Sequence, residues 1–195
     1  MTVPAASAEL AHAAATLDRR AFLRLVAVAT AAGLLPSGCG KVPAALAPSP
    51  DRTLAVLSPR AYATFTAVAL RVIGPAGAEL ILARTIDVGA TADAWLARTP
   101  GLATPITQAL GVLEFGVWPL VSKVRPYTTL DVDAQDRVLD DLMRARLDLK
   151  GAIFQGLRAL SLLSFYSAPA SRALTGDPGP FGNERIPIAA GMLGR

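Results

Sequence analysis

The chain has 195 residues, of which 52% are hydrophobic, 17% charged and 6% aromatic, and its mean hydropathy is +0.43. This length suits one domain with an N-terminal extension, and the low charged fraction excludes an intrinsically disordered chain. The net charge is +4 at pH 7, but the basic residues are scattered without a run, so the sequence predicts no nucleic-acid partner.

Histidine and cysteine each occur once, as His12 and Cys39, and both lie within residues 1–39, the predicted leader. The rest of the chain therefore lacks the side chains for a His/Cys zinc site, an iron–sulfur cluster, a c-type haem attachment, a Ser-His-Asp triad or a cysteine nucleophile. Chemistry based on carboxylate, lysine or tyrosine side chains stays open at this point. With the family resemblance described below, we expect no metal site, no cofactor of its own and no catalytic residue.

Residues 1–39 have the order of an export signal. An apolar run over 25–35 follows a short basic stretch. As a helix the run would span about 17 Å, short of a roughly 30 Å hydrocarbon core, which favours a signal segment over a membrane-spanning helix. The basic stretch resembles the twin-arginine signal, with Asp18 where Ser or Thr usually stands. The residues that carry this resemblance are Arg19, Arg20, Phe22 and Leu23.

That resemblance implies recognition by the twin-arginine export machinery, which carries folded proteins, and a location in the periplasm or on the periplasmic side of the membrane. Ser37-Gly38-Cys39 resembles a lipid-attachment site, although Pro36 stands where Leu is preferred. Three fates of the leader stay open: lipidation at Cys39, cleavage elsewhere, or retention as a weak anchor.

Residues 40–56 contain three prolines among alanines and are expected to form an extended tether. A helical domain is predicted over 57–167. Its first helix begins with Ser58 as N-cap and Pro59 at the first position, and ends at Gly74-Pro75. A second helix is predicted within 87–97.

A third helix is predicted from the cap signal Thr104-Pro105 to Pro119. It lacks an 18-residue apolar run, so we expect a buried central helix rather than a membrane span, and its Glu114 is expected to pair with an arginine rather than to catalyse.

Asp131 caps a predicted fourth helix from about 132. Asp131 and Asp133 form an acidic pair at its start, which helix capping explains better than acid–base catalysis. A fifth helix is predicted from about 149 until 165–167. Because no run alternates with period two long enough for a strand, the predicted class is all-α, a compact bundle of about five helices.

Residues 168–195 form a Pro/Gly-rich tail, predicted to be irregular and either disordered or laid along another protein's surface. No phosphate-binding glycine motif occurs in it.

The end of the chain also carries a resemblance to a known family. Phe154 opens a pattern of Leu157, Arg158 and Leu160 that closes with Phe165-Tyr166-Ser167-x-Pro169, and Gly-x-Pro-Gly-Pro-Phe follows over 176–181. Together with the Leu57-Ser58-Pro59 helix start and the arginine-pair leader, this resembles the gluconate 2-dehydrogenase subunit 3 family, the small helical subunits of exported flavin dehydrogenases.

The resemblance implies a non-catalytic accessory subunit that binds a large FAD-containing alcohol or sugar dehydrogenase subunit, in some members with a multihaem cytochrome c. Such a chain would serve as export escort and scaffold. The alternative is a stand-alone exported helical lipoprotein with a structural role in the envelope, anchored through Cys39. Aromatic anchors beside a flexible segment suit interfaces. The residues expected to contact the partner are Phe165, Tyr166, Pro169, Pro180 and Phe181.

Overall fold

The computed structural model describes residues 42–116, 125–145 and 148–176, and these residues form seven α-helices, two short 3-10 helices and no strand. The predicted all-α class is thus confirmed. The leader, Pro180 and Phe181 lie outside the described residues. The elements are α3 (Pro59–Ile73), α4 (Pro75–Leu82), α5 (Val88–Arg98), α6 (Pro100–Phe115), η1 (Tyr127–Thr129), α7 (Val132–Arg144), α8 (Asp148–Tyr166), η2 (Pro169–Ser171) and α9 (Arg172–Thr175).

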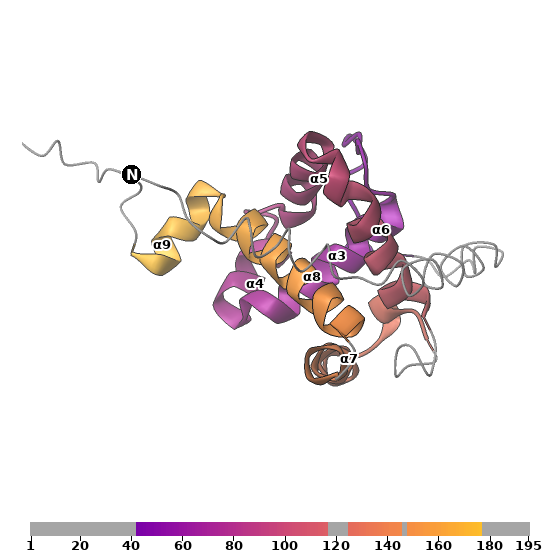
Figure 1. Ribbon diagram of the computed structural model, residues 1–195. Coiled ribbons are helices and arrows are strands. Elements are labelled where there is room, and N and C mark those ends of the chain that lie inside the picture. Colours follow the sequence, from indigo (N-terminus) through magenta and orange to yellow (C-terminus); the bar gives the residue numbers. More distant parts are fainter. Residues whose placement is uncertain (1–41, 117–124, 146–147, 177–195) are drawn as a thin grey trace, which may run out of the picture.

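Helix α3 lies at the centre of the bundle, and α4, α5, α6 and α8 pack around it (Figure 1). The Ser58 side chain caps its start by accepting a hydrogen bond from the Ala61 N–H at 3.2 Å, and Pro59 fits the first position because its missing N–H has no partner there. Every residue from 62 to 69 is buried. A helix that is apolar on all sides is stable only inside a protein, so α3 requires the surrounding helices.

A short helix, α4, follows where we expected the chain to leave helical structure. Gly74 ends α3 with a φ of 84°, which glycine adopts readily, and Pro75 then opens α4. The sequence predicts that Gly74-Pro75 ends a helix, and the structure shows that the pair also forms the corner between α3 and α4. Helix α4 packs closely against the end of α8 at Gly77, where a Cβ atom would stand 2.9 Å from the Phe165 ring.

Helix α6 begins earlier than predicted, at Pro100 instead of Thr104-Pro105. Pro105 lies inside the helix, near its start. Its missing N–H leaves the carbonyl of Gly101 without a helical partner, and because Gly101 is exposed, water can satisfy that carbonyl. Proline near a helix start therefore does not mark the first residue uniquely.

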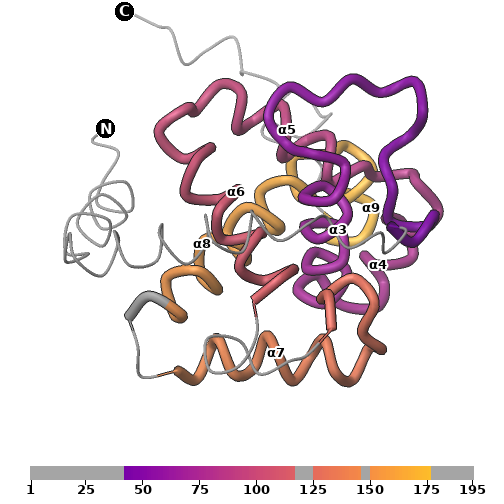
Figure 2. The backbone as a smooth tube through the Cα atoms, turned by 90° about the vertical axis from the view of Figure 1, so that its right-hand side faces the viewer, coloured from indigo at the N-terminus to yellow at the C-terminus, as the bar shows by residue number. Residues whose placement is uncertain are grey.

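Helices α7 and α8 follow the predictions. Asp131 caps α7 by accepting from the Ala134 N–H at 2.7 Å. Its outer face is charged, with Arg144 paired to Asp140 at 2.9 Å, while Leu142 faces the core. Helix α8 crosses α3 and ends at Tyr166, as expected, and α7 lies along one edge of the bundle against it (Figures 1 and 2).

The segment before α3 does not form the extended tether that we expected for 40–56. Residues 42–57 run along the outside of the bundle (Figure 2) and are bonded to it. Leu46 and Leu57 are buried, and a turn closes with the Leu46 N–H donating to the Pro43 carbonyl at 2.9 Å. The segment stays on the bundle because the Asp93 and Arg84 side chains bind its backbone, and its prolines lie in or beside turns.

The first part of the expected irregular tail is also folded, since η2 and α9 occupy residues 169–175. The Ser171 hydroxyl donates to the Ala168 carbonyl at 2.7 Å, and Gly176 ends α9 in the left-handed region with a φ of 65°. A serine side chain and a terminal glycine thus support one further turn that composition alone did not indicate.

Gly89 offers a test of this packing. A Cβ atom there would overlap the Tyr62 ring, and Tyr62 is buried. We expect Gly89→Ala to lower the free energy of unfolding by about 1–3 kcal/mol because the ring must shift. Gly111→Ala is the matched control, since its Cβ meets nothing within 4 Å, and should be neutral or slightly stabilising. Urea unfolding monitored by circular dichroism measures both, and equal stability of the two variants would contradict this packing.

Candidate functional site

Among the α8 residues whose exposure is described, one exposed side chain, Arg158, is charged, and the other exposed ones are uncharged. The uncharged ones recur at three- and four-residue spacing, which places them on one stripe. Leu163 and Tyr166 at its C-terminal end are 45% and 52% exposed. The stripe consists of Ala152, Gln155, Ala159, Leu163 and Tyr166. Arg158 stands next to this stripe, which itself carries no charge, whereas charged side chains normally cover the solvent side of a helix.

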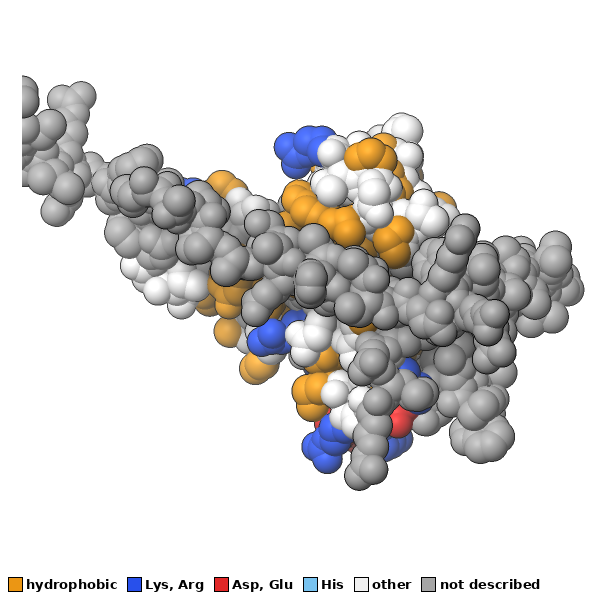
Figure 3. Space-filling model, viewed as in Figure 1, with side chains coloured by type: hydrophobic (Ala, Val, Ile, Leu, Met, Phe, Trp, Pro, Cys, Tyr) orange, Lys and Arg blue, Asp and Glu red, His pale blue; other side chains and the backbone are white. Residues whose placement is uncertain are grey.

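The same surface continues into η2 and α9. Pro169 is exposed, and Leu174 is 48% exposed. We call the stripe of α8, together with these two residues, the α8–α9 face. In the space-filling view, small groups of apolar side chains reach the surface near α4 and α9, and a larger group lies over α5 (Figure 3). The exposed side of α7 differs, because Asp133, Asp136 and Arg137 cover it.

The residues expected to contact a partner have different places in the fold. Tyr166 and Pro169 belong to the α8–α9 face. Phe165 is only 1% exposed and lies in the core against α4, so its expected role in a partner contact is corrected to internal packing. Its ring also stands edge-on to Tyr166, with 5.2 Å between centroids. Consecutive residues of an α-helix point in different directions, so Phe165 faces the core whereas Tyr166 faces outward.

Glu114 pairs with an arginine, as predicted. Its carboxylate is almost fully buried, lies 3.1 Å from the Arg60 guanidinium and accepts from the Thr128 hydroxyl at 2.7 Å and the Thr128 N–H at 3.0 Å. The Thr64 hydroxyl donates to it at 3.2 Å. The Glu114 carboxylate thus connects η1 with α3, and its contacts serve to hold the two elements together.

Asp93, on α5, holds the end of segment 42–57. Its buried carboxylate accepts from three successive backbone N–H groups, of Ala55 at 2.8 Å, Val56 at 2.9 Å and Leu57 at 2.7 Å. Burial alone would raise the pKa of the Asp93 carboxyl, but these bonds and the nearby Arg52 outweigh it and hold the pKa below its usual value.

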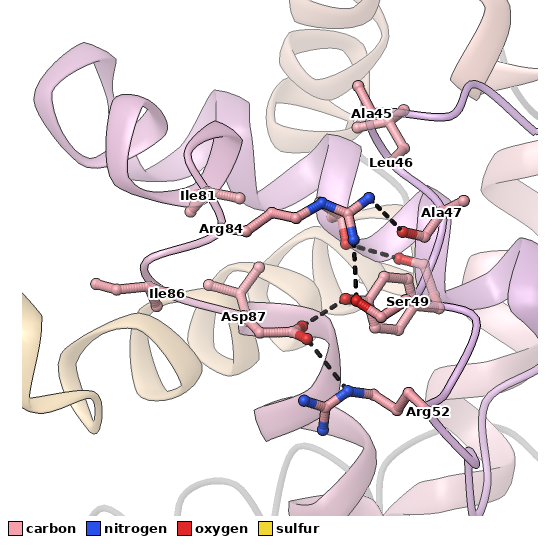
Figure 4. A pocket seen from close by; sticks show the side chains of 12 residues that line it. Ala45, Leu46, Ala47, Ser49, Arg52, Ile81, Arg84, Ile86 and Asp87 are labelled. Atoms are coloured by element: carbon pink, nitrogen blue, oxygen red, sulfur yellow. Dashed lines mark hydrogen bonds and ion pairs between the residues drawn. The ribbon is translucent and has the colours of Figure 1, made fainter.

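A second cluster lines a cavity of about 160 Å³ between this segment and α3–α5 (Figure 4). The Tyr62 hydroxyl donates to Asp87 at 2.5 Å, and Asp87 also caps α5 and faces Arg52 at 3.4 Å. Burial, and then the Asp87 carboxylate, raise the pKa of Tyr62, so the hydroxyl stays a proton donor. Arg84 reaches across to Ser49 and to two backbone carbonyls. These contacts join residues 44–52 to α3 and to the connection between α4 and α5, and each of these side chains has a structural partner.

Within the described residues, no three or more His, Cys, Asp or Glu side chains gather in a way that could hold a metal ion. Across the same residues, no helix combines the length and the apolar character needed to cross a membrane. Comparison of the chain with family models, with curated proteins and with solved structures finds no match. Function is therefore inferred from the residues and their geometry.

Sequence reasoning missed Asp93 and Arg84. Asp93 stands in a predicted helix between alanines, and a single acid on a buried side of a helix is the one signal that pointed to it. Its partners are backbone amides, which carry no sequence signature. The uncharged stripe was present in the sequence, but only the orientation of α8 shows that it faces outward.

The Asp93 carboxylate predicts a pH-dependent stability. Because its pKa is lower in the folded than in the unfolded chain, its contribution is complete above about pH 5 and is lost as the pH falls through the folded value. We expect Asp93→Asn to cost about 1–3 kcal/mol at pH 7 and less at pH 3. Urea unfolding at both pH values measures the difference. Asp133→Asn, an exposed control, should change little at pH 7, and a cost of Asp93→Asn that is equal at both pH values would refute the role of the charge.

Proposed function

We propose that this chain is a non-catalytic accessory subunit of an exported, FAD-dependent alcohol or sugar dehydrogenase complex. It leaves the cytoplasm through the twin-arginine route with its large partner and serves that partner as export escort and scaffold. The observation that carries the partner contact is the α8–α9 face, where Leu163, Tyr166 and Leu174 are exposed on and beside the longest helix of the described domain. The kind of partner, an FAD-dependent dehydrogenase, is what the resemblance to the gluconate 2-dehydrogenase subunit 3 family implies.

The composition of this face supports a protein partner. The centre of a protein interface is depleted of charge and enriched in aromatic side chains. On the α8–α9 face, the exposed aromatic side chain Tyr166 lies between the exposed Leu163 and Pro169, which matches this composition. Arg158 and Arg172 are exposed beside the face. The matching surface of the partner would be apolar at its centre and carry carboxylates at its rim, where ion pairs guide association.

The leader supports the second part of the proposal. Arg19 and Arg20 precede an apolar run that is too short to span a bilayer. A signal for folded cargo suits a chain that binds its partner before transport. A partner of the FAD-dependent kind that the family resemblance implies would also need this route, because a flavoprotein that acquires FAD in the cytoplasm must travel folded.

Purification from the native host tests the partner. We expect the tagged chain to bring down a yellow, FAD-containing polypeptide. Leu163→Asp/Tyr166→Asp should reduce the recovered flavin more than tenfold, because two charges would be desolvated in the interface. Leu102→Asp, a control on α6 with a similarly exposed leucine, should leave recovery unchanged. Isolation of the native chain as a lone monomer would overturn the proposal and favour the stand-alone lipoprotein.

The arginine pair tests the escort role. Arg19→Lys/Arg20→Lys keeps the charge but removes the planar guanidinium groups, so recognition by the export machinery should be lost. If the partner has no signal of its own, its flavin-linked dehydrogenase activity should then accumulate in the cytoplasm with unaltered FAD content. Cell fractionation with an activity assay measures this. Periplasmic activity at the normal level, with the small chain retained inside, would show that the partner travels alone.

A further inference from the structure

Residues 42–57, here called the strap, connect the leader with the first helix of the domain. They lie along the outside of α3–α5, and two separate sets of polar contacts hold them there. The strap contains no helix or strand of its own. Its position therefore depends on the surface beneath it.

The first set of contacts is the Asp93 clamp. A carboxylate has about four acceptor positions, and three are filled by the successive N–H groups of residues 55–57 at 2.7–2.9 Å. Charge-assisted hydrogen bonds of this length are strong ones, and both Asp93 and Leu57 are buried. The clamp fixes the strap where it enters α3.

The second set is the Arg84 hook, near the start of the strap. The guanidinium donates to the carbonyls of Ala44 and Ala47, both at 3.2 Å, and to the Ser49 hydroxyl at 3.1 Å (Figure 4). Arg84 is the one described non-glycine residue with positive φ, at 57°. A glycine would suit that backbone better, so the presence of arginine there points to a use for its side chain.

Both sets of contacts exist only when α3, α4 and α5 are packed together. Arg84 lies in the connection between α4 and α5, and Asp93 lies on α5. The Tyr62–Asp87 hydrogen bond fixes that connection to α3, and the Arg52–Asp87 ion pair adds the middle of the strap. An unfolded or partly folded domain therefore offers the strap no place to bind.

We propose that the strap is a folding-dependent latch between the leader and the domain. Closed, it holds the chain against the surface of the packed domain from Val42 onward. Open, it releases the whole of 42–57, up to roughly 50 Å of extended chain, and exposes Leu46 and Leu57 to proteases and chaperones. Export follows from the closed state. This last step rests on the proposed export function, whereas the latch itself does not.

Limited proteolysis of the purified full chain tests the latch. Trypsin needs a local opening to cleave after Arg52, and under native conditions the cleavage rate follows the population of the open state. We expect Asp93→Asn and Arg84→Ala to raise the rate of release of the fragment that begins at Thr53 by tenfold or more, with helix content unchanged by circular dichroism. Mass spectrometry identifies the fragment.

Matched controls separate the strap contacts from general effects. Asp133→Asn removes an exposed acid on α7, and Arg98→Ala an exposed arginine on α5 whose contact is within its own helix. Neither should change the rate. Arg84→Gly relieves the backbone while it removes the hook, so it should open the strap as Arg84→Ala does. Because Arg84 is exposed, its variants answer the question even if Asp93→Asn fails to fold.

Export of the same variants in a host with the twin-arginine machinery tests the consequence. We expect Asp93→Asn and Arg84→Ala to accumulate in the cytoplasm or be degraded, and both controls to be exported as the wild type is. Unchanged cleavage after Arg52 would overturn the latch, and rapid cleavage with normal export would overturn its link to transport. The co-purification experiment tests the flavoprotein partner separately. Its outcome changes neither the rate of cleavage after Arg52 nor the export of the variants.

Discussion

Burial of α3 on all its sides is the constraint on which the rest of the domain depends. Eight consecutive residues, 62–69, are removed from water, and no single neighbouring helix can cover them. Helices α4, α5, α6 and α8 therefore surround α3. Burying a large apolar side chain such as Phe65 contributes about 1.5–3 kcal/mol, so each covering helix is held mainly by what it hides of α3.

Two buried carboxylates complete this arrangement in the same way. Glu114 and Asp93 each lie within the bundle and each accept hydrogen bonds from backbone N–H groups outside the α-helices. Such N–H groups have no partner within an α-helix, and an unsatisfied buried group is costly. One acid thus fixes η1 and the other fixes the strap. The domain uses its few internal charges to attach these segments to the α-helical core.

Local signals in the sequence were sufficient for most of the helices. Ser58 and Asp131 cap α3 and α7 as expected, since a cap involves residues only three apart. Some failures were local, because Thr104-Pro105 was taken as the start of α6 and Gly74-Pro75 only as a helix end. The others concern long-range relations. Phe165 was assigned to the surface because its packing partner on α4 is far along the chain, and the strap was assigned to solvent because Asp93 is 36 residues beyond its end. The side of α8 that faces outward likewise depends on tertiary packing.

The uncharged stripe on α8 also bears on how the lone chain behaves in water. Leu163 and Tyr166 are about half exposed, and the exposed charges nearby, Arg158 and Arg172, lie beside the face, so electrostatic repulsion between two copies would act at its rim and not at its centre. Contact between two copies at this face removes apolar surface from water, so the share of self-associated chain rises with the concentration of the free protein. The same exposed side chains therefore set the concentration range in which the isolated chain stays monomeric.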